Sequence, residues 1–513
     1  MPVGVFRTWV KQVEKGSFPN TRRVFSVMRC NHCTNAPCVE ICPVEALYIR
    51  KDGIVDFDKD RCIGCRSCMQ ACPYDALYID PESHTAAKCN YCAHRVDIGL
   101  EPACVNVCPE HAIISGDLDN PDSEIAALLS QEQVTVRKQS KGTVPNLFYI
   151  DGDEWSLNPT ATAREQYAFS AQERGVGHYA EKMAFDGDNL VTAALAANGN
   201  GYTAEQVAQG NQVGLKSIDA MMGQEARRYY DAPDKGILWG REVWGYVWTK
   251  AIATGAFLVP FLAWIFGKSD ALSIGDWWMS AGLSLTFLIL TTALLVRDLD
   301  QPFRFIYVLL RPQWRSWLVK GGYALTLYGG LLSIWALSMW FGWQQLQTVI
   351  MAVTAAFAVI AAVYTAFLFA QAKGRDFWQS PTLSLHMLAH SLMAGAAAFL
   401  IAALFLEMSA EWFLFLKNML YGAIAANAVI LLLELGTTHP SADAATTVEM
   451  ILKGRYSRRF WLGTVLLGNV LPVVLLYFGT GSIFAAAAGV LALAGILITE
   501  QIWVEAPQRI PLS

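Results

Sequence analysis

Charge is scarce in this sequence, and the chain contains no extended basic tract. Of its 513 residues only 16% are charged, whereas 54% are hydrophobic, and the mean hydropathy is +0.30. Such an apolar excess is too large for an ordinary soluble enzyme, so part of the chain is expected to lie in lipid. The net charge of −5 is small, which together with the lack of a basic run argues against nucleic acid as a partner.

Cysteine is absent from most of the chain. All 12 cysteines lie between Cys30 and Cys108, and apolar runs of about 20 residues, the length that spans a bilayer, occur only after Trp244. The sequence therefore predicts two physically different halves. We expect no secretory signal at the start of this sequence, because the first residues contain no apolar core, and the pair Arg22 and Arg23 precedes a cysteine motif rather than an apolar stretch.

The cysteines fall into three quartets, and each quartet ends in Cys-Pro. The middle quartet has the spacing of bacterial ferredoxins, in which three thiolates hold one [4Fe–4S] cluster and the fourth ligates the other cluster of the pair. Short C-x-x-C spacings argue against a disulfide framework, and structural zinc sites need no remote fourth cysteine before proline. The quartets are Cys30, Cys33, Cys38 and Cys42; Cys62, Cys65, Cys68 and Cys72; and Cys89, Cys92, Cys104 and Cys108.

Crossing the first two quartets gives two complete cluster sites. One would combine the first three cysteines of the first quartet with Cys72, and the other would combine the first three of the second quartet with Cys42. The segments 46–49 and 76–79 follow the two prolines at the same offset, so we interpret the quartets as internal repeats of one ferredoxin unit. Exchange of the fourth cysteine requires an even number of quartets, but this sequence has three. The third quartet therefore has no partner quartet in the sequence.

Residues 1 to about 155 resemble the four-cluster ferredoxin subunit of the molybdopterin oxidoreductases, which include the dimethyl sulfoxide, polysulfide and sulfite enzymes. The resemblance implies an α+β ferredoxin-like iron–sulfur domain that exchanges electrons with a separate molybdopterin catalytic subunit. In that family a further quartet stands immediately before the segment that here reads PVGVFRTWVK. We expect an upstream quartet to complete up to four clusters, and the alternative is that the third site is incomplete.

A polar and irregular stretch begins at about residue 116. We expect short amphipathic helices near 123–129 and 204–208. Residues 156–241 are interpreted as a connector between the iron–sulfur domain and the apolar half.

The apolar half, residues 242–513, is expected to be an all-α polytopic membrane domain surrounded by lipid. Eight stretches are long enough to cross a bilayer about 30 Å thick. An even number returns the chain to the side on which it started. The stretches are 246–266, 277–296, 318–341, 347–371, 384–406, 412–435, 460–479 and 482–503.

Basic residues in the short loops predict the orientation. They gather in the loops on the ferredoxin side, and the opposite loops offer little beyond Lys268, so the ferredoxin domain is expected to be cytoplasmic, at a bacterial-type inner membrane. The competing explanation is that these residues dock the acidic ferredoxin surface. They are Arg297, Arg304, Arg311, Arg315, Lys320, Lys373, Arg375, Lys453, Arg455, Arg458, Arg459 and Arg509.

The membrane half also resembles a known family. Segments 298–305, 310–317 and 372–378 are similar to the loops of the NrfD-type anchor of polysulfide reductase and its relatives. That resemblance implies an anchor that exchanges electrons and protons with the quinone pool near the ferredoxin face and that contains no haem. His386 and His390 share one helix face and do not supply the opposed ligands of a b-type haem, and no C-x-x-C-H motif occurs.

Ionisable side chains inside a bilayer are costly and usually functional. We therefore expect Tyr364, His386, Asp298 and Arg304 to contact quinone, with Glu434 as a proton relay. The simpler alternative is that each buried side chain is satisfied by a neighbouring backbone carbonyl.

The sequence thus predicts a quinone-linked electron conduit without a primary substrate site of its own. Two alternatives stay open: a subunit that moves protons or ions while electrons pass, and a passive anchor whose clusters serve a separate quinone-reactive subunit. The direction of electron flow is not fixed by the residues.

Overall fold

The computed structural model describes residues 5–15, 22–169, 226–230 and 235–513 of the chain. The chain divides into two compact units, which are described separately. The first contains Met1–Gly236 together with the last three residues, Pro511–Ser513, and the second is Ile237–Ile510.

A four-stranded sheet lies in the first unit, with the order β2-β1-β10-β9. Strands β1 (Thr8–Lys15) and β2 (Arg22–Arg29) form an antiparallel pair, and β10 (Ala226–Tyr230) continues the sheet antiparallel to β1. Strand β9 (Ala163–Phe169) is parallel to β10. Two strands of the predicted connector therefore belong to the same sheet as the start of the chain.

The first two cysteine quartets build the same local structure twice. In the first copy α1 (Pro37–Ile41) precedes the antiparallel strands β3 (Leu47–Ile49) and β4 (Val55–Phe57). The second copy has α2 (Ser67–Ala71) before β5 (Leu77–Ile79) and β6 (Ala86–Lys88). Helices α1 and α2 pack against each other. The predicted internal repeat is thus present in the backbone.

The rest of the first unit consists of short elements. The helix expected near 123–129 is α5 (Glu124–Gln131), which begins where the Ser123 side chain accepts a hydrogen bond from the backbone N–H of Ala126. The helix expected at 204–208 lies outside the described residues. The remaining elements are α3 (Ala93–Val96), α4 (Ala103–Asn106), β7 (Val134–Thr135), η1 (Gln139–Lys141), β8 (Tyr149–Ile150) and α6 (Glu154–Leu157).

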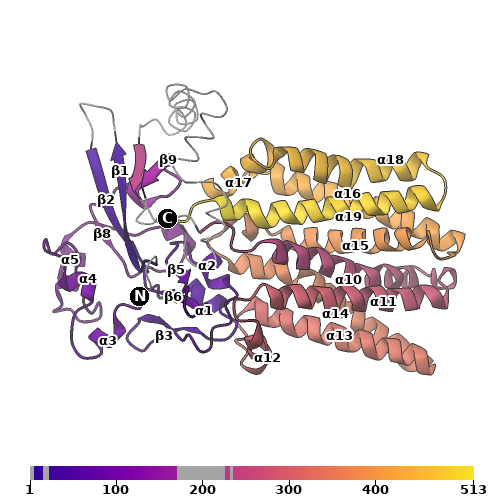
Figure 1. The fold of residues 1–513 in the computed structure, drawn as a ribbon, viewed down its shortest axis with the longest axis horizontal. Coiled ribbons are helices and arrows are strands. Elements are labelled where there is room, and N and C mark those ends of the chain that lie inside the picture. Colours follow the sequence, from indigo (N-terminus) through magenta and orange to yellow (C-terminus); the bar gives the residue numbers. More distant parts are fainter. Residues whose placement is uncertain (1–4, 16–21, 170–225, 231–234) are drawn as a thin grey trace. The chain divides into compact units, whose positions relative to one another are not determined.

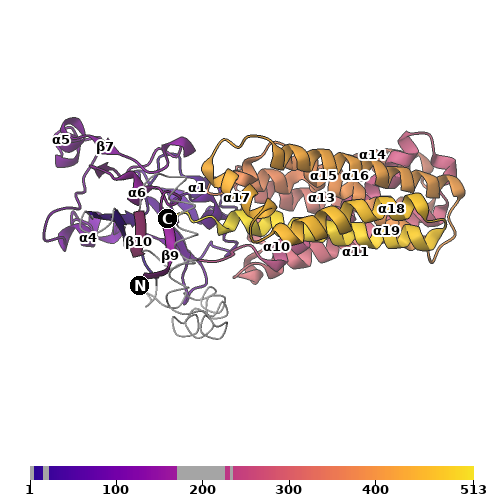
Figure 2. The same cartoon turned by 90° about the horizontal axis from the view of Figure 1, so that it is seen from above.

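Long apolar helices run side by side in the second unit (Figures 1 and 2). Over the described residues, eight segments have the length and hydropathy needed to cross a membrane, as predicted. They are α10 (Arg241–Ile265), α11 (Ile274–Arg297), α13 (Trp317–Phe341), α14 (Gln344–Gln371), α15 (Leu383–Ala402), α16 (Ala410–Gly436), η5 (Arg459–Val470) continued by α18 (Leu471–Phe478), and α19 (Ser482–Glu505).

Shorter elements connect these helices. They are η2 (Ser269–Ala271), η3 (Pro302–Arg304), α12 (Tyr307–Leu310), η4 (Asp376–Gln379), α17 (Ala442–Leu452) and η6 (Ala506–Arg509). Segment η5 is π-helical, a conformation that is rare outside single turns and often found at functional positions.

Glycine permits the closest helix contacts in the bundle. A Cβ atom on Gly255 of α10 would lie 1.8 Å from the backbone oxygen of Ser391 on α15. Likewise, a Cβ atom on Gly495 of α19 would lie 2.0 Å from Cα of Gly468 in η5. Small residues at such crossings let the two helix backbones approach closely. Close packing matters in lipid, where the hydrophobic effect does not drive helices together. Helix α15 is central, since it packs against α10, α14, α16 and α19.

Candidate functional site

Two enclosed cavities in the first unit are each lined by four cysteines. One is lined by Cys30, Cys33, Cys38 and Cys72, and the other by Cys42, Cys62, Cys65 and Cys68. This grouping agrees with the crossed pairing expected from the sequence. Four sulfur atoms around an enclosed and otherwise largely apolar space form the donor set of a [4Fe–4S] cluster.

The short helices distribute the cysteines between the two cavities. Cys38 lies inside α1, whereas Cys42 follows it in an extended conformation with φ −64° and ψ 119°. In the second copy Cys68 lies inside α2, and Cys72 follows with φ −74° and ψ 114°. The change from helix to extended backbone turns the fourth cysteine of each quartet away from the first three.

Backbone N–H groups point at the sulfur atoms of the second cavity. The N–H of Ala46 donates to Cys42 Sγ at 3.2 Å, and the N–H of Ala86 donates to Cys62 Sγ at 3.3 Å. At the first cavity the Lys88 ammonium donates to Cys30 Sγ at 3.4 Å. Hydrogen bonds to cluster sulfurs and local burial set cluster potentials, so these donors fit the proposed ligands.

Burial strongly affects the protonation of these thiols. It raises the pKa of Cys33 and of Cys65 to about 12. Without a positively charged partner these groups would therefore stay protonated at neutral pH. Metal binding deprotonates coordinating thiols, so a metal cluster is the kind of group that would stabilise four buried sulfurs as thiolates.

The third quartet repeats the backbone conformation of the other two. The residue before the second cysteine has positive φ in every quartet: 42° at His32, 71° at Gly64 and 56° at Tyr91. Three residues after the fourth cysteine, φ is positive again, and these positions are Glu45, Asp75 and His111. Non-glycine residues rarely adopt positive φ, so the shared conformations mark the third quartet as another copy of the same motif.

The third quartet is nevertheless more open than the others. Cys89 is buried, whereas Cys92, Cys104 and Cys108 are partly exposed. Arg29 donates to Cys104 Sγ at 3.1 Å, and the N–H of Ala112 donates to Cys108 Sγ at 3.2 Å. The latter contact matches the one that Ala46 makes with Cys42 in the first copy.

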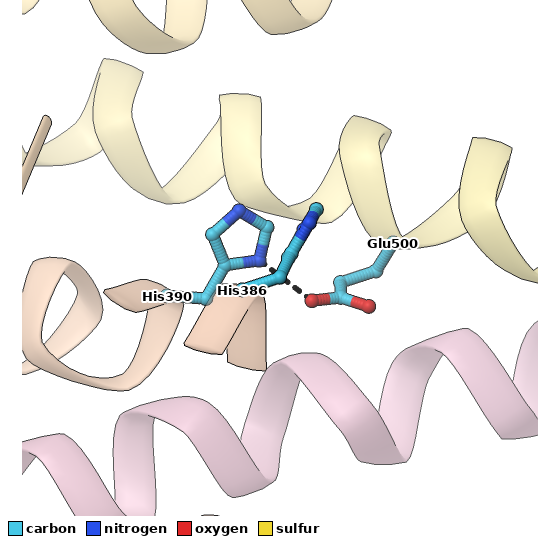
Figure 3. A group of neighbouring side chains, drawn as sticks. All are labelled: His386, His390 and Glu500. Carbon is cyan, nitrogen blue, oxygen red and sulfur yellow. Dashed lines mark hydrogen bonds and ion pairs between the residues drawn. The ribbon is translucent and has the colours of Figure 1, made fainter. Parts of the chain in front are cut away.

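In the second unit, two buried histidines of α15 each contact a buried glutamate of a neighbouring helix. His386 Nδ1 is 2.8 Å from a carboxylate oxygen of Glu434 on α16, and His390 Nδ1 is 2.7 Å from a carboxylate oxygen of Glu500 on α19. The two imidazole rings are 4.2 Å apart between centroids. Figure 3 shows His386 and His390 from one helix beside Glu500.

The Glu434 carboxylate accepts two further hydrogen bonds. The indole N–H of Trp503 donates to it at 3.0 Å, and the Thr382 hydroxyl donates at 3.1 Å. Three polar partners around one buried carboxylate fix its position.

A buried lysine lies on α10. Lys250 Nζ donates to Thr365 Oγ1 at 2.6 Å and to the backbone oxygen of Ala362 at 3.0 Å. The ammonium also lies 4.6 Å from the ring centroid of Tyr364 on α14. That ring packs on Gly321, where a Cβ atom would come within 2.1 Å of it.

The structure brings some predicted quinone residues together. His386 and Glu434 are in direct contact, whereas Tyr364 lies beside Lys250. Asp298 follows the last residue of α11, and Arg304 ends η3. Sequence reasoning overlooked Lys250 and Glu500, although each is an ionisable residue within an apolar run, the same signal that identified Glu434.

Comparison with known protein families gives two matches that divide the chain as the structure does. Residues 22–118 match the family model described as a 4Fe-4S dicluster domain. Residues 232–508 match the model described as polysulphide reductase, NrfD.

Individual relatives each match a little under a third of the chain. The B component of tetrathionate reductase from Salmonella typhimurium is 46% identical over 162 residues, which are 31% of this chain and 65% of that protein. The B component of polysulfide reductase from Wolinella succinogenes is 41% identical over 155 residues, covering 29% of this chain and 80% of that protein. The NrfC homolog of Haemophilus influenzae is 43% identical over 153 residues, 29% of this chain and 68% of that protein. The match thus spans less than two thirds of the Salmonella protein.

Proposed function

Because this chain belongs to the polysulphide reductase NrfD family and carries an N-terminal 4Fe-4S dicluster domain, we propose that it passes electrons between a separate molybdopterin catalytic subunit and the quinone pool. The observation that carries the proposal is the presence, in one chain, of two four-cysteine cavities and an eight-span membrane bundle. The clusters would transfer electrons one at a time, and quinone in the membrane would accept or donate them in pairs.

For the iron–sulfur half we propose the crossed ligand sets. Cys30, Cys33 and Cys38 with Cys72 would hold one cluster, and the second cavity would hold the other. Such clusters supply one-electron transfer when bound. The protein's own contribution is to bury the sulfurs and to aim N–H donors and the Lys88 ammonium at them. We propose that the third quartet binds cluster iron as well, because it shares the backbone conformation of the first two.

For the membrane half we propose that Tyr364, His386, Asp298 and Arg304 form the quinone site, with Glu434 as the proton relay. The direct contact between His386 and Glu434 supports this assignment, since a proton moving at the imidazole has a buried carboxylate as its neighbour. Lys250 joins the proposed set because its side-chain nitrogen lies against the Tyr364 ring.

We propose that the first unit faces the cytoplasm at a bacterial-type inner membrane. The support is the excess of arginine and lysine in the loops that follow the second, fourth and sixth spans.

Cluster re-oxidation by quinone tests the proposed function directly. The purified full-length protein would be reduced and then mixed with a water-soluble quinone analogue, while the clusters are followed by electron paramagnetic resonance. We expect Tyr364→Phe and His386→Gln to retain the clusters and to slow re-oxidation at least tenfold. Tyr477→Phe, at a tyrosine that is 75% exposed, is the matched control. If quinone does not re-oxidise the clusters of the wild-type protein, the proposal is wrong and the membrane half is only a passive anchor.

A second candidate function, proton movement across the bilayer, is favoured by the consecutive buried contacts from Thr382 through Glu434 to His386. In proteoliposomes, Glu434→Gln should then abolish charge movement while quinone turnover continues. Equal loss of both would assign Glu434 to quinone chemistry alone.

A further inference from the structure

Three buried side chains between α15 and α19 form a group with the composition of a metal site. His386 and His390 are each 1% exposed, and Glu500 is 2% exposed. One ligand atom from each residue can be chosen so that all three lie within 4.8 Å of one another. Figure 3 shows the hydrogen bond between His390 and the Glu500 carboxylate, with the His386 ring beside them.

Both histidines have a nitrogen without a partner. Each Nδ1 atom contacts a glutamate, whereas the Nε2 atoms of His386 and His390 are buried and have no hydrogen-bond partner among the described residues. His386 donates Nδ1–H to the Glu434 carboxylate and therefore carries its lone pair on Nε2. A carboxylate that holds a histidine in this way fixes the tautomer and orients the ring for a metal ion. His390 faces Glu500 through Nδ1, so it would bind the ion through that nitrogen and lose the proton there as the ion enters.

The sequence spacing agrees with the geometry. Histidines at positions i and i+4 of one helix present their rings on one face, as in the His-x-x-x-His pairs of zinc proteases. A carboxylate from another element completes the two-histidine, one-carboxylate set that binds zinc and other divalent transition metals. Here Glu500 supplies that carboxylate from α19.

Charge also favours a cation at this position. Glu434 and Glu500 place two carboxylates in the interior of the bundle, where unpaired charge is costly. The buried side-chain nitrogen of Lys250 on α10 is already bonded to Thr365 and to the oxygen of Ala362. A divalent ion would offset both carboxylates while the imidazoles stay neutral.

We propose that His386, His390 and Glu500 bind one divalent transition-metal ion of the zinc class. With zinc bonds of about 2.0–2.1 Å, tetrahedral ligand atoms lie about 3.3–3.5 Å apart. The side chains, whose ligand atoms lie within 4.8 Å of one another, therefore adjust when the ion enters, and the fourth position stays open. Of the three ligands only His386 belongs to the quinone site proposed above, and zinc binding can be measured whether or not the chain exchanges electrons with quinone.

A bound ion would have two consequences. It would connect α15 to α19, and it would prevent His386 from exchanging a proton with quinone. Zinc would therefore act as an inhibitor of the membrane half.

The test uses the full-length protein in detergent with its clusters intact. After chelator treatment, Zn²⁺ alone is added, the bound metal is counted by mass spectrometry, and its ligands are identified by X-ray absorption at the zinc edge. We expect one zinc per chain with only nitrogen and oxygen ligands at about 2.0–2.1 Å, because cysteine would show sulfur at about 2.3 Å. Absence of bound zinc, or zinc bound only by sulfur, would overturn the proposal.

Variants locate the site. His390→Gln and Glu500→Gln should each weaken zinc binding at least tenfold, whereas His439→Gln, at a histidine in the segment between α16 and α17, should not. If His390→Gln fails to assemble, the ligand shell of the wild-type protein still decides the question. Zinc affinity that is unchanged in correctly assembled Glu500→Gln protein would refute the assignment of the carboxylate.

Discussion

Cys38 and Cys42 lie four residues apart at one short helix, yet they line different cavities. The same division separates Cys68 from Cys72 at α2. Each helix therefore connects the two cavities covalently, and the cavities cannot move independently.

This relationship gives a test of the crossed ligand sets. Cys38→Ser and Cys72→Ser should remove the same cluster signal, although they lie in different quartets, because both sulfurs line one cavity. Cys42→Ser should remove the other signal. Electron paramagnetic resonance of the reduced protein distinguishes the two. If the single variants Cys38→Ser and Cys42→Ser instead lose the same signal, each quartet holds its own cluster.

The third quartet makes a prediction about iron content. Two clusters account for about eight iron atoms per chain, so the native protein should contain more than this number if the third quartet binds iron. Cys89→Ser should lower the iron content without affecting the signals lost in Cys38→Ser and Cys42→Ser. Native protein with eight iron atoms or fewer would contradict the prediction.

Asp80 should make the first unit sensitive to acid. Burial by itself would raise its pKa, but hydrogen bonds from Lys59 at 3.0 Å and from the N–H groups of Glu82 and Ser83 outweigh burial, so the pKa is lowered. The stabilisation is therefore present above the unfolded pKa of about 3.9 and is lost as pH falls through the lower folded value.

Asp80→Asn removes this effect. We expect the free energy of unfolding to fall by about 1–2 kcal/mol at neutral pH and the difference from wild type to shrink as pH falls below the unfolded pKa of about 3.9. Thermal unfolding followed at several pH values measures it. Asp117→Asn, on an exposed carboxylate, serves as the control, and a pH-independent difference would disprove the charge mechanism.

The crossing of α10 and α15 should tolerate no side chain at Gly255. Gly255→Ala would place Cβ 1.8 Å from the backbone oxygen of Ser391, so the helices would have to separate. We expect a large drop in the thermal stability of the detergent-solubilised protein. Gly422→Ala on α16 has open space around the new Cβ atom, and it should be neutral or slightly stabilising because alanine favours helix.

Lys250 should affect quinone chemistry although it lies outside the residues expected from the sequence. Lys250→Met keeps the length of the side chain but removes the cation from the Tyr364 ring and the hydrogen bond to Thr365. We expect quinone turnover to fall about tenfold with the clusters intact. Lys268→Met, on a partly exposed lysine 3.8 Å from Glu411, should behave like wild type. Normal turnover in Lys250→Met would exclude Lys250 from the site.

Local patterns explain why much of this architecture could be predicted. Cysteine spacing relates the two repeats, and hydropathy locates eight spans to within a few residues. The sheet partners of β1 could not be predicted in this way, because β10 comes from residues more than 200 positions later and carries no strong alternation.

The histidine–glutamate pairs inside the membrane half also could not be predicted from local sequence patterns. Hydropathy identifies Glu434 as unusual, but only packing of α16 against α15 shows that its partner is His386. Glu500 escaped notice because it lies near the end of its span, where a charged residue is common.

The last residues of the chain contribute to the first unit. Arg137 donates to the backbone oxygen of Leu512, Arg228 donates to that of Ser513, and Trp9 donates to the Ser513 hydroxyl. Residues 511–513 leave the ribosome after every membrane span, so these contacts cannot form while the spans are still being synthesised. Biogenesis therefore has a built-in order, in which the iron–sulfur unit gains its final contacts only after the eighth span has been made.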